Sequence, residues 1–320
     1  MKKIKMNMQS EITIREGGER YLRWCKLNNY SLDTVLHYER TLHNFSLFCS
    51  LDVPLANLNE TLMEDYILYL REKGISSVTL NTYVRGMKTI ANYLIEKGLL
   101  KPFEIIIPKA ETTVKEVYTE TELNKLLKKP DVKKCSFSQY RNWVMVNYLL
   151  GTGQRRNTVV NIKIGDLDLE NQLVRLNVMK NRKQVILPLT KSLVNILEEY
   201  LTYRGGTDQD YLFCTWEGKQ FTRDGLTLTI RKYNIKRGVD RTSMHLFRHT
   251  FAYLAIKNNM DIIRLQQLLC HSKLETTQRY LQSFGFEDLK ENYERYNPLE
   301  VIIGNNSISR DWRDKQKKLR

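Results

Sequence analysis

Side chains suited to phosphate chemistry stand close together in the segment 243–280, SMHLFRHTFAYLAIKNNMDIIRLQQLLCHSKLETTQRY. His245 and Arg248 are three residues apart, so they share one face of a helix. A histidine beside an arginine suits an anion, because both donate hydrogen bonds and arginine stays charged. The segment ends on His271 and, nine residues later, Tyr280. We therefore expect this stretch to hold a phosphate and to present a tyrosine to it.

Further cations precede this stretch. The turn GTGQRR places two glycines just before Arg155 and Arg156, and glycine allows a tight turn that brings guanidinium groups close to a ligand. Apolar residues alternate over 173–178 and 185–189, which predicts a β-hairpin. Its turn carries Lys180, Arg182 and Lys183. Charged hairpin tips are usually only solvated, so the hairpin alone does not establish a site.

The charge balance favours a polyanionic partner. The chain has 320 residues, and 51 Lys+Arg against 36 Asp+Glu give a net charge of +15. Such an excess most often indicates nucleic acid, although a merely soluble basic protein also fits the charge. Five widely spaced cysteines without metal-site or redox-motif spacing favour a reducing cytosol. Because no long apolar run follows the basic start of the chain, we expect neither a secretory signal nor a membrane span.

Residues 11–98 are expected to form four short helices, because apolar residues recur at three- and four-residue spacing. The first two cover 12–27 and 32–49. Asn59 or Thr61 caps the third helix, and Ser76 or Ser77 caps the fourth, which Gly98 ends. Four helices of this length predict a small bundle.

Basic residues on the last two of these helices could form a solvated face or a surface that contacts phosphates, and the sequence favours neither interpretation. The candidate DNA contacts of the whole chain are Arg71, Arg85, Lys88, Arg156, Arg182 and Lys183.

A change in composition divides the chain. Two prolines and no clear period predict an extended linker after the bundle, and Thr119-x-x-Glu122 is a capping box that opens a new helix. The expected parts are a helical DNA-binding domain at 1–100, a linker at 101–117, a catalytic domain at 118–300 and a basic disordered tail at 301–320. Within the catalytic domain we expect helices over 140–151, 193–203, 222–237 and 286–296, and a short strand at 211–213.

The second domain holds Arg155, Lys180, His245, Arg248, His271 and Tyr280 in that order, and this set resembles the tyrosine recombinase (phage integrase) family, Xer-like two-domain type. Four segments carry the resemblance: a TG-x-R turn at 152–155, a basic hairpin at 180–189, H-x-x-R-H-T-F-A at 245–252, and H-S-x-x-x-T-T-x-x-Y at 271–280. The resemblance implies a mainly α fold with a small β-sheet or hairpin. Its parts would be a four-helix, SAM-like core-binding domain and a mixed α/β catalytic domain.

The resemblance further implies a site-specific recombinase that cleaves and rejoins DNA through a 3′-phosphotyrosine and a Holliday junction. Five-coordinate phosphorus carries extra negative charge, which fixed cations must meet. The implied roles are Arg155 and Arg248 on the non-bridging oxygens, Tyr280 as nucleophile, His245 as its acid/base partner, His271 as a transition-state donor, and Lys180 (alternatively Lys183) as acid for the leaving 5′-oxygen. No cofactor and no metal is expected.

Other features bear on partners and alternatives. Four protomers would act on a double-stranded recombination site, exchanging the helix at 286–296, with an accessory recombination factor as a further partner. The protein would be cytoplasmic and nucleoid-associated, encoded by a bacterium, phage or mobile element. A catalytically silent DNA-binding module of the same fold and a type IB topoisomerase-like relaxing enzyme remain alternatives.

Four positions need separate comment. His245 and His249 could form half a zinc site, but a zincin helix would need Glu where Leu246 stands. His249 is therefore expected to pack or to form a local hydrogen bond. Relative to the family pattern, Gln154 replaces a hydrophobic residue and Cys270 replaces a glycine, while every catalytic group is kept.

Overall fold

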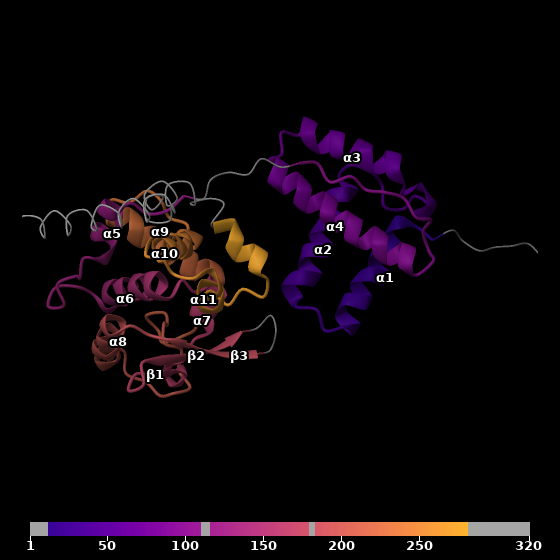
Figure 1. Ribbon diagram of the computed structural model, residues 1–320. Helices are drawn as coiled ribbons and strands as arrows, with labels where there is room; N and C mark the ends of the chain where they lie inside the picture. The colour runs from indigo at the N-terminus through magenta and orange to yellow at the C-terminus, as the bar shows by residue number, and fades with distance from the viewer. Residues whose placement is uncertain (1–11, 110–115, 179–182, 281–320) are drawn as a thin grey trace, which may run out of the picture. The chain divides into compact units, whose positions relative to one another are not determined.

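The computed structural model describes residues 12–109, 116–178 and 183–280, and the chain divides into two compact units, 1–113 and 114–320 (Figure 1). The described residues are mostly helical, with one small sheet, which confirms the predicted fold class. Several expected features lie outside the described residues: Lys180, Arg182, the helix at 286–296 and the tail at 301–320.

Residues 12–109 of the first unit form four α-helices: α1 (Ile14–Leu27), α2 (Leu32–Ser46), α3 (Glu60–Glu72) and α4 (Ser77–Glu96), with a 3-10 turn, η1 (Leu55–Asn57), before α3. Each α-helix begins after a residue whose side-chain oxygen accepts a backbone N–H of the first turn. These caps are Thr13, Ser31, Asn59 and Ser76, of which the last two were among the predicted alternatives. The apolar faces meet in a core that contains Phe45, Tyr66, Met87 and Leu94.

A small residue sets how closely α2 and α4 pack. Gly86 lies on the buried side of α4, and a Cβ there would come within 2.5 Å of the Thr41 Oγ1 of α2. Thr41 is itself buried and donates to the His37 carbonyl. The close contact of these two helices therefore requires a glycine at this position.

The segment that follows α4 is held against this unit. Leu100 and Ile105 are buried in its core, and the Lys88 ammonium donates to the Ile105 carbonyl at 2.8 Å. Asn81, also on α4, donates to the Pro108 carbonyl at 2.8 Å. Residues 101–109, predicted to be a linker, have no regular secondary structure, and this part packs along α4.

The second unit mixes helices with a three-stranded antiparallel sheet. The elements before the sheet are α5 (Glu120–Leu127), α6 (Phe137–Thr152), α7 (Arg156–Asn161) and η2 (Ile164–Asp166). The strands are β1 (Leu167–Asp168), β2 (Leu173–Val178) and β3 (Lys183–Pro188), in that order in the sheet. The helices after it are α8 (Lys191–Arg204), α9 (Arg223–Lys236), α10 (Met244–Lys257) and α11 (Ile262–Leu268).

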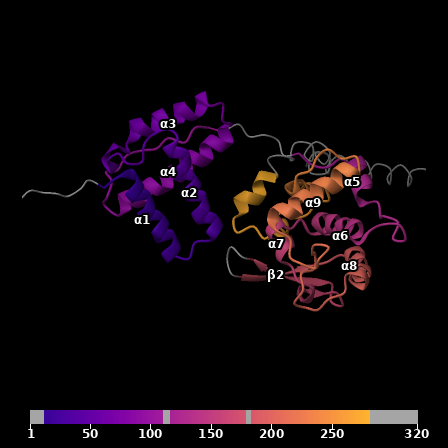
Figure 2. The same cartoon turned by 180° about the vertical axis from the view of Figure 1, so that it is seen from behind.

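Helix α6 forms the centre of this unit. Its residues 143–146 are all buried, as expected for a helix that is covered on every side. In two opposite views, α8 and the sheet lie on one side of it and α9 on the other (Figures 1 and 2). Helix α10 also packs directly on α6.

The sequence predicted most of the longer elements, but α7, β1 and α11 were not predicted, and one predicted strand is wrong. The short strand expected at 211–213 is wrong, because only a single bridge joins Tyr211 to Lys163. The chain turns into η2 directly after Lys163, so the ladder cannot continue. Of the helices described, none combines the length and apolar character needed to cross a bilayer.

The packing of α2 against α4 gives a first prediction. Gly86→Ala should lower the free energy of unfolding of the first unit by about 1–3 kcal/mol, because the new methyl group overpacks the contact. Helix propensity alone would predict stabilisation of about 1 kcal/mol. Hydrogen exchange of the α2 and α4 amides measures the effect.

Thr41→Ala provides the control for this prediction, since it removes the two atoms that a Cβ at position 86 would meet first. The double variant should exchange more slowly than Gly86→Ala alone. Equal protection in Gly86→Ala and the parent protein would contradict the steric account.

Candidate active site

A left-handed turn at the end of α6 begins the site. Gly153 has φ 59°, and a Cβ there would lie 2.7 Å from the Phe251 ring of α10. A side chain at this position would therefore be strained and would also push the turn away from α10. Arg155 follows as the residue that precedes the first turn of α7. Gly153 thus brings the Arg155 turn against α10.

Arg248 of α10 joins three segments of the second unit. Its NH1 donates to the Gly153 carbonyl at 2.8 Å, and its NH2 donates to the Leu269 carbonyl at 2.7 Å. The same NH2 lies 2.7 Å from Nε2 of His271. The side chain is only 4% exposed. One guanidinium therefore connects α10, the turn after α6 and the loop after α11.

Arg155 reaches the same loop. Its NH1 lies 3.1 Å from the Cys270 carbonyl and 3.5 Å from the Leu269 carbonyl, which also accepts from Arg248. Cys270 has φ 51°, in the left-handed region where the family pattern has glycine. This conformation turns the chain so that the carbonyls of residues 269 and 270 face the two arginines.

Burial and neighbouring charge act together on Arg248. Burial, followed by the positive charge of Arg155, lowers the pKa of Arg248 to about 10, so the group stays charged at neutral pH. Its hydrogen-bond partners include two carbonyls, the His271 imidazole and the Tyr280 phenol, and these groups are neutral. A buried cation paired only with neutral groups favours the binding of an anion.

The protonation of His271 follows from its partners. A guanidinium can only donate, so Nε2 of His271 must accept from Arg248 and carries no proton. The proton of the neutral ring is therefore on Nδ1, which donates to the Thr277 hydroxyl at 2.8 Å. Thr277 is fully buried. Both ring nitrogens of His271 are thus engaged in fixing Arg248 and the helical residues 274–280.

Tyr280 ends the described chain with its ring inside the protein. It is 3% exposed, and its ring stacks on that of His271 with centroids 6.2 Å apart. Its hydroxyl lies 3.1 Å from Nδ1 of His249. Burial raises the pKa of Tyr280, and the positive charges of Arg248 and Arg155 oppose this shift. The same chain thus supplies the phenol and both guanidinium groups that bear on it.

His245 lies one turn before His249 on α10, with ring centroids 6.4 Å apart. The surrounding protein lowers the pKa of His245, and the positive charges of Arg248, Arg156 and Arg155 add to this, although the side chain still reaches solvent. The imidazole is therefore neutral at pH 7.

Gln154 connects the same two loops as the arginines. It is buried, and its side-chain amide donates to the Leu268 carbonyl at 3.1 Å and to the Thr152 carbonyl at 3.3 Å. A hydrophobic side chain could not make either bond. The departure from the family pattern therefore adds a polar link between the Arg155 turn and the end of α11.

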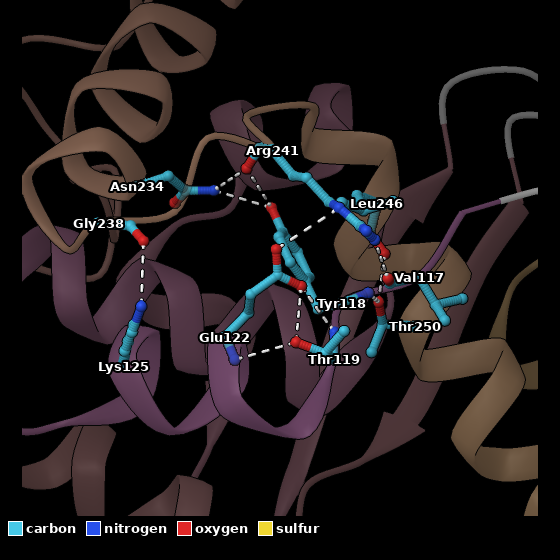
Figure 3. A network of polar contacts seen from close by, with 10 residues as sticks. All are labelled: Val117, Tyr118, Thr119, Glu122, Lys125, Asn234, Gly238, Arg241, Leu246 and Thr250. Atoms are coloured by element: carbon cyan, nitrogen blue, oxygen red, sulfur yellow. Dashed lines mark hydrogen bonds and ion pairs between the residues drawn. The ribbon is translucent and has the colours of Figure 1, made fainter.

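A polar network fixes the start of α10 (Figure 3). The Tyr118 backbone N–H donates to the Thr250 hydroxyl at 2.9 Å, and Asn234 of α9 donates to the Tyr118 hydroxyl at 2.8 Å. Arg241 donates to the Val117 carbonyl at 2.7 Å. The predicted capping box of Thr119 opens α5 beside these contacts. Val117 and Tyr118 thereby connect α10 with α9 and Arg241.

Five of the six predicted catalytic residues can be located, and Arg155, His245, Arg248, His271 and Tyr280 surround one site. Among the candidate DNA contacts, Arg156 donates to Thr227 of α9, while Lys88 donates to the Ile105 carbonyl. Arg71 and Arg85 are exposed, and Lys183 opens β3. The described residues contain no group of three His, Cys, Asp or Glu placed for a metal ion.

Three residues of the site were not predicted for the roles they have in the structure. His249 contacts the phenol, Thr277 orients His271, and Gln154 links two loops. The sequence held a signal for the first two: His249 is four residues after His245, and Thr277 is three before Tyr280, so each pair shares a helix face. Nothing local in the sequence shows the distant partner of Gln154.

Two parts of the chain match models of known families. Residues 116–285 match the model of the phage integrase family, and residues 19–105 match that of the phage integrase SAM-like domain. The chain is similar to a tyrosine recombinase XerC of Leptospira interrogans, 27% identical over 90% of this chain and 95% of the relative. It is also similar to a tyrosine recombinase of Pseudothermotoga lettingae, 30% identical over 78% of this chain and 86% of the relative.

The fold is also that of a solved structure. The Tn1549 transposon integrase in complex with transposon right end DNA aligns with a TM-score of 0.72, over 89% of this chain and 99% of that one, at 19% identity. At that identity the likeness concerns the fold. The family match at 116–285 covers more than half of the sequence. The chain therefore belongs to the phage integrase family.

Proposed function

We propose that this protein is a site-specific DNA recombinase that cuts one strand at a time and joins the 3′-phosphate to Tyr280. The observation that carries the proposal is Arg248: a buried cation whose described partners are neutral, beside Arg155 and the Tyr280 phenol. A DNA phosphate supplies the missing negative charge at that point. The relatives named tyrosine recombinase and the transposon integrase bound to DNA support the same reaction.

The two guanidinium groups are proposed to hold the non-bridging oxygens of the reacting phosphate. Charge on these oxygens grows as the phosphorus becomes five-coordinate, and fixed cations stabilise that state more than the starting one. Arg155 and Arg248 are already oriented by the carbonyls of Leu269 and Gly153. The two guanidinium groups themselves therefore need little reorientation when the phosphate arrives.

The other side chains are assigned by their positions and by family resemblance. His245, which is neutral and reaches solvent, is proposed to be an acid/base group on the DNA side of the site. When the phosphate takes over Arg248, Nε2 of His271 is freed and, once protonated, donates to a phosphate oxygen. Lys180 of the hairpin, or Lys183, protonates the leaving 5′-oxygen.

Access of DNA to the phenol requires a local change. Tyr280 is 3% exposed, so a phosphate reaches it only after the helical residues 274–280 shift. We propose that duplex binding drives this shift, with the net charge of +15 supplying affinity for the backbone. Arg71, Arg85, Lys88, Arg156, Arg182 and Lys183 are the proposed backbone contacts.

The complete reaction is proposed to use four protomers on two duplexes. Each Tyr280 cleaves one strand, and the 5′-hydroxyl of the partner duplex then attacks the phosphotyrosine, so a Holliday junction forms and no external energy source is needed. Exchange of the segment 286–296 between protomers would hold the tetramer together, and an accessory factor would set the direction.

The covalent intermediate gives the most direct prediction of the chemistry. Nicked duplex fragments of genomic DNA that flanks the gene should yield a protein–DNA adduct, and Tyr280→Phe should yield none, because the attacking oxygen is missing. Trypsin cuts after Arg279, so the modified peptide begins at Tyr280 and mass spectrometry can locate the nucleotide. An adduct that persists in Tyr280→Phe would contradict the assignment.

A second prediction concerns the shape of the cation at Arg248. Arg248→Lys should slow single-turnover adduct formation about 10²–10³-fold, because an ammonium cannot bind phosphate bidentately while also meeting the two carbonyls. Arg264→Lys, on the exposed face of α11, is the matched control and should react like the parent protein. If Arg248→Lys also reacts at the parent rate, Arg248 is not the phosphate clamp.

A third prediction concerns the charge around His245. The ¹³C-labelled imidazoles of the five histidines can be titrated by NMR, with His245 assigned from His245→Gln. Its pKa should lie below the ordinary 6.5, because burial and three nearby arginines disfavour the imidazolium. Sulfate should raise this pKa, since an anion between the arginines offsets their repulsion. If the pKa of His245 in sulfate equals that in chloride at the same ionic strength, no anion binds between these arginines.

A further inference from the structure

We propose that His249 is the base that takes the proton of Tyr280 during strand cleavage, a role that rests on the function proposed above. The observation is a direct contact: Nδ1 of His249 lies 3.1 Å from the Tyr280 hydroxyl, within the distance for proton transfer between positioned groups. The two rings have centroids 5.5 Å apart and are tilted by 59° relative to one another.

A base is needed at this position. An unperturbed phenol has a pKa of about 10, so very little phenolate exists at neutral pH. The interior position of Tyr280 moves the pKa further up, and the two arginines only oppose that change. A neighbouring base that accepts the proton while the oxygen attacks removes the need to form free phenolate first.

The other groups beside the phenol are less suited to the task. Arg248 and Arg155 are cations and cannot accept a proton. Nε2 of His271 accepts from Arg248, and its Nδ1 donates to Thr277, so both its nitrogens are committed. Family resemblance implies His245 for this role, but its ring centroid lies 6.4 Å from that of His249, and it is Nδ1 of His249 that lies within hydrogen-bond distance of the Tyr280 hydroxyl.

Helix α10 places His249 beside the tyrosine. It is adjacent to Arg248, which is buried, and one turn after His245, which reaches solvent. Side chains at successive positions point in different directions around a helix. Position 249 therefore presents its ring to the residues 274–280, while position 245 presents its ring one turn closer to the start of α10.

Each proton that moves during strand cleavage has a donor and an acceptor. The oxygen of Tyr280 forms a bond to phosphorus as its O–H bond breaks, and the proton moves to Nδ1 of His249. The bond from phosphorus to the 5′-oxygen breaks, and this oxygen keeps the electron pair and receives a proton from the lysine of the hairpin. Rejoining reverses both transfers, so His249 returns its proton to the phenol.

The test measures the single-turnover rate of adduct formation on a nicked duplex that the parent protein cleaves. His249→Ala should be about 10²–10⁴-fold slower, the usual contribution of a general base. His249→Asn is the decisive variant, because its amide oxygen can accept the phenol hydrogen bond near the place of Nδ1 but cannot keep a proton. It should be as slow as His249→Ala, and a rate restored to that of the parent protein would reduce His249 to a positioning residue.

A modified substrate separates this role from proton donation to the leaving group. With sulfur in place of the bridging 5′-oxygen, the leaving thiolate needs no acid, so a defect in the acid is rescued. His249→Ala should stay slow on this substrate, because its defect concerns the nucleophile. Rescue by sulfur would overturn the proposal, and so would a His249→Ala variant faster than the parent, which would mean that the contact restrains the phenol.

Controls distinguish failure of this inference from failure of the function. Thermal unfolding and DNA affinity of both variants should match the parent protein, which excludes misfolding as the cause of a slow rate. If the parent protein forms a Tyr280 adduct and the variants form it equally fast, only the role of His249 is lost. If the parent protein forms no adduct on any DNA, the recombinase function and the role of His249 fail together.

Discussion

The arrangement of the second unit depends on one buried guanidinium. Arg248 donates to the carbonyls of Gly153 and Leu269 and to His271, which belong to segments more than 100 residues apart in sequence. Burial of a charge is costly unless its donors are satisfied, so these acceptors must be in place when the unit folds. The same constraint keeps the Arg155 turn, the end of α11 and the tyrosine helix around one point.

This constraint couples stability to chemistry. The acceptors of Arg248 satisfy its hydrogen-bond donors but do not neutralise its charge. The site therefore favours the binding of an anion. Electrostatic preorganisation of this kind is most effective where water is excluded, as it is around a side chain that is 4% exposed. Thr277 and Gln154 extend the effect, because one orients His271 and the other ties the Arg155 turn to Leu268.

Local sequence patterns predicted the helices and the candidate catalytic residues, because both depend on residues only a few positions apart. Caps such as Asn59 and Ser76, and the H-x-x-R block, need no knowledge of distant residues. The contact of His249 with Tyr280 and the bond of Gln154 to Leu268 join residues 31 and 114 positions apart, and only the folded chain brings these together. For the same reason the prediction of a strand at 211–213 was wrong, because the segment that pairs with Tyr211 turns into η2 after Lys163.

The most direct measurement of the central claim is an experimental structure of Tyr280→Phe bound to duplex DNA that contains its cleavage site. The account predicts that the non-bridging oxygens of one phosphate hydrogen-bond to both Arg155 and Arg248, with ring 280 beside the same phosphorus. It also predicts that the Gly153 and Leu269 carbonyls keep their bonds to Arg248. A phosphate bound elsewhere, with Arg248 still enclosed by its neutral partners, would contradict it.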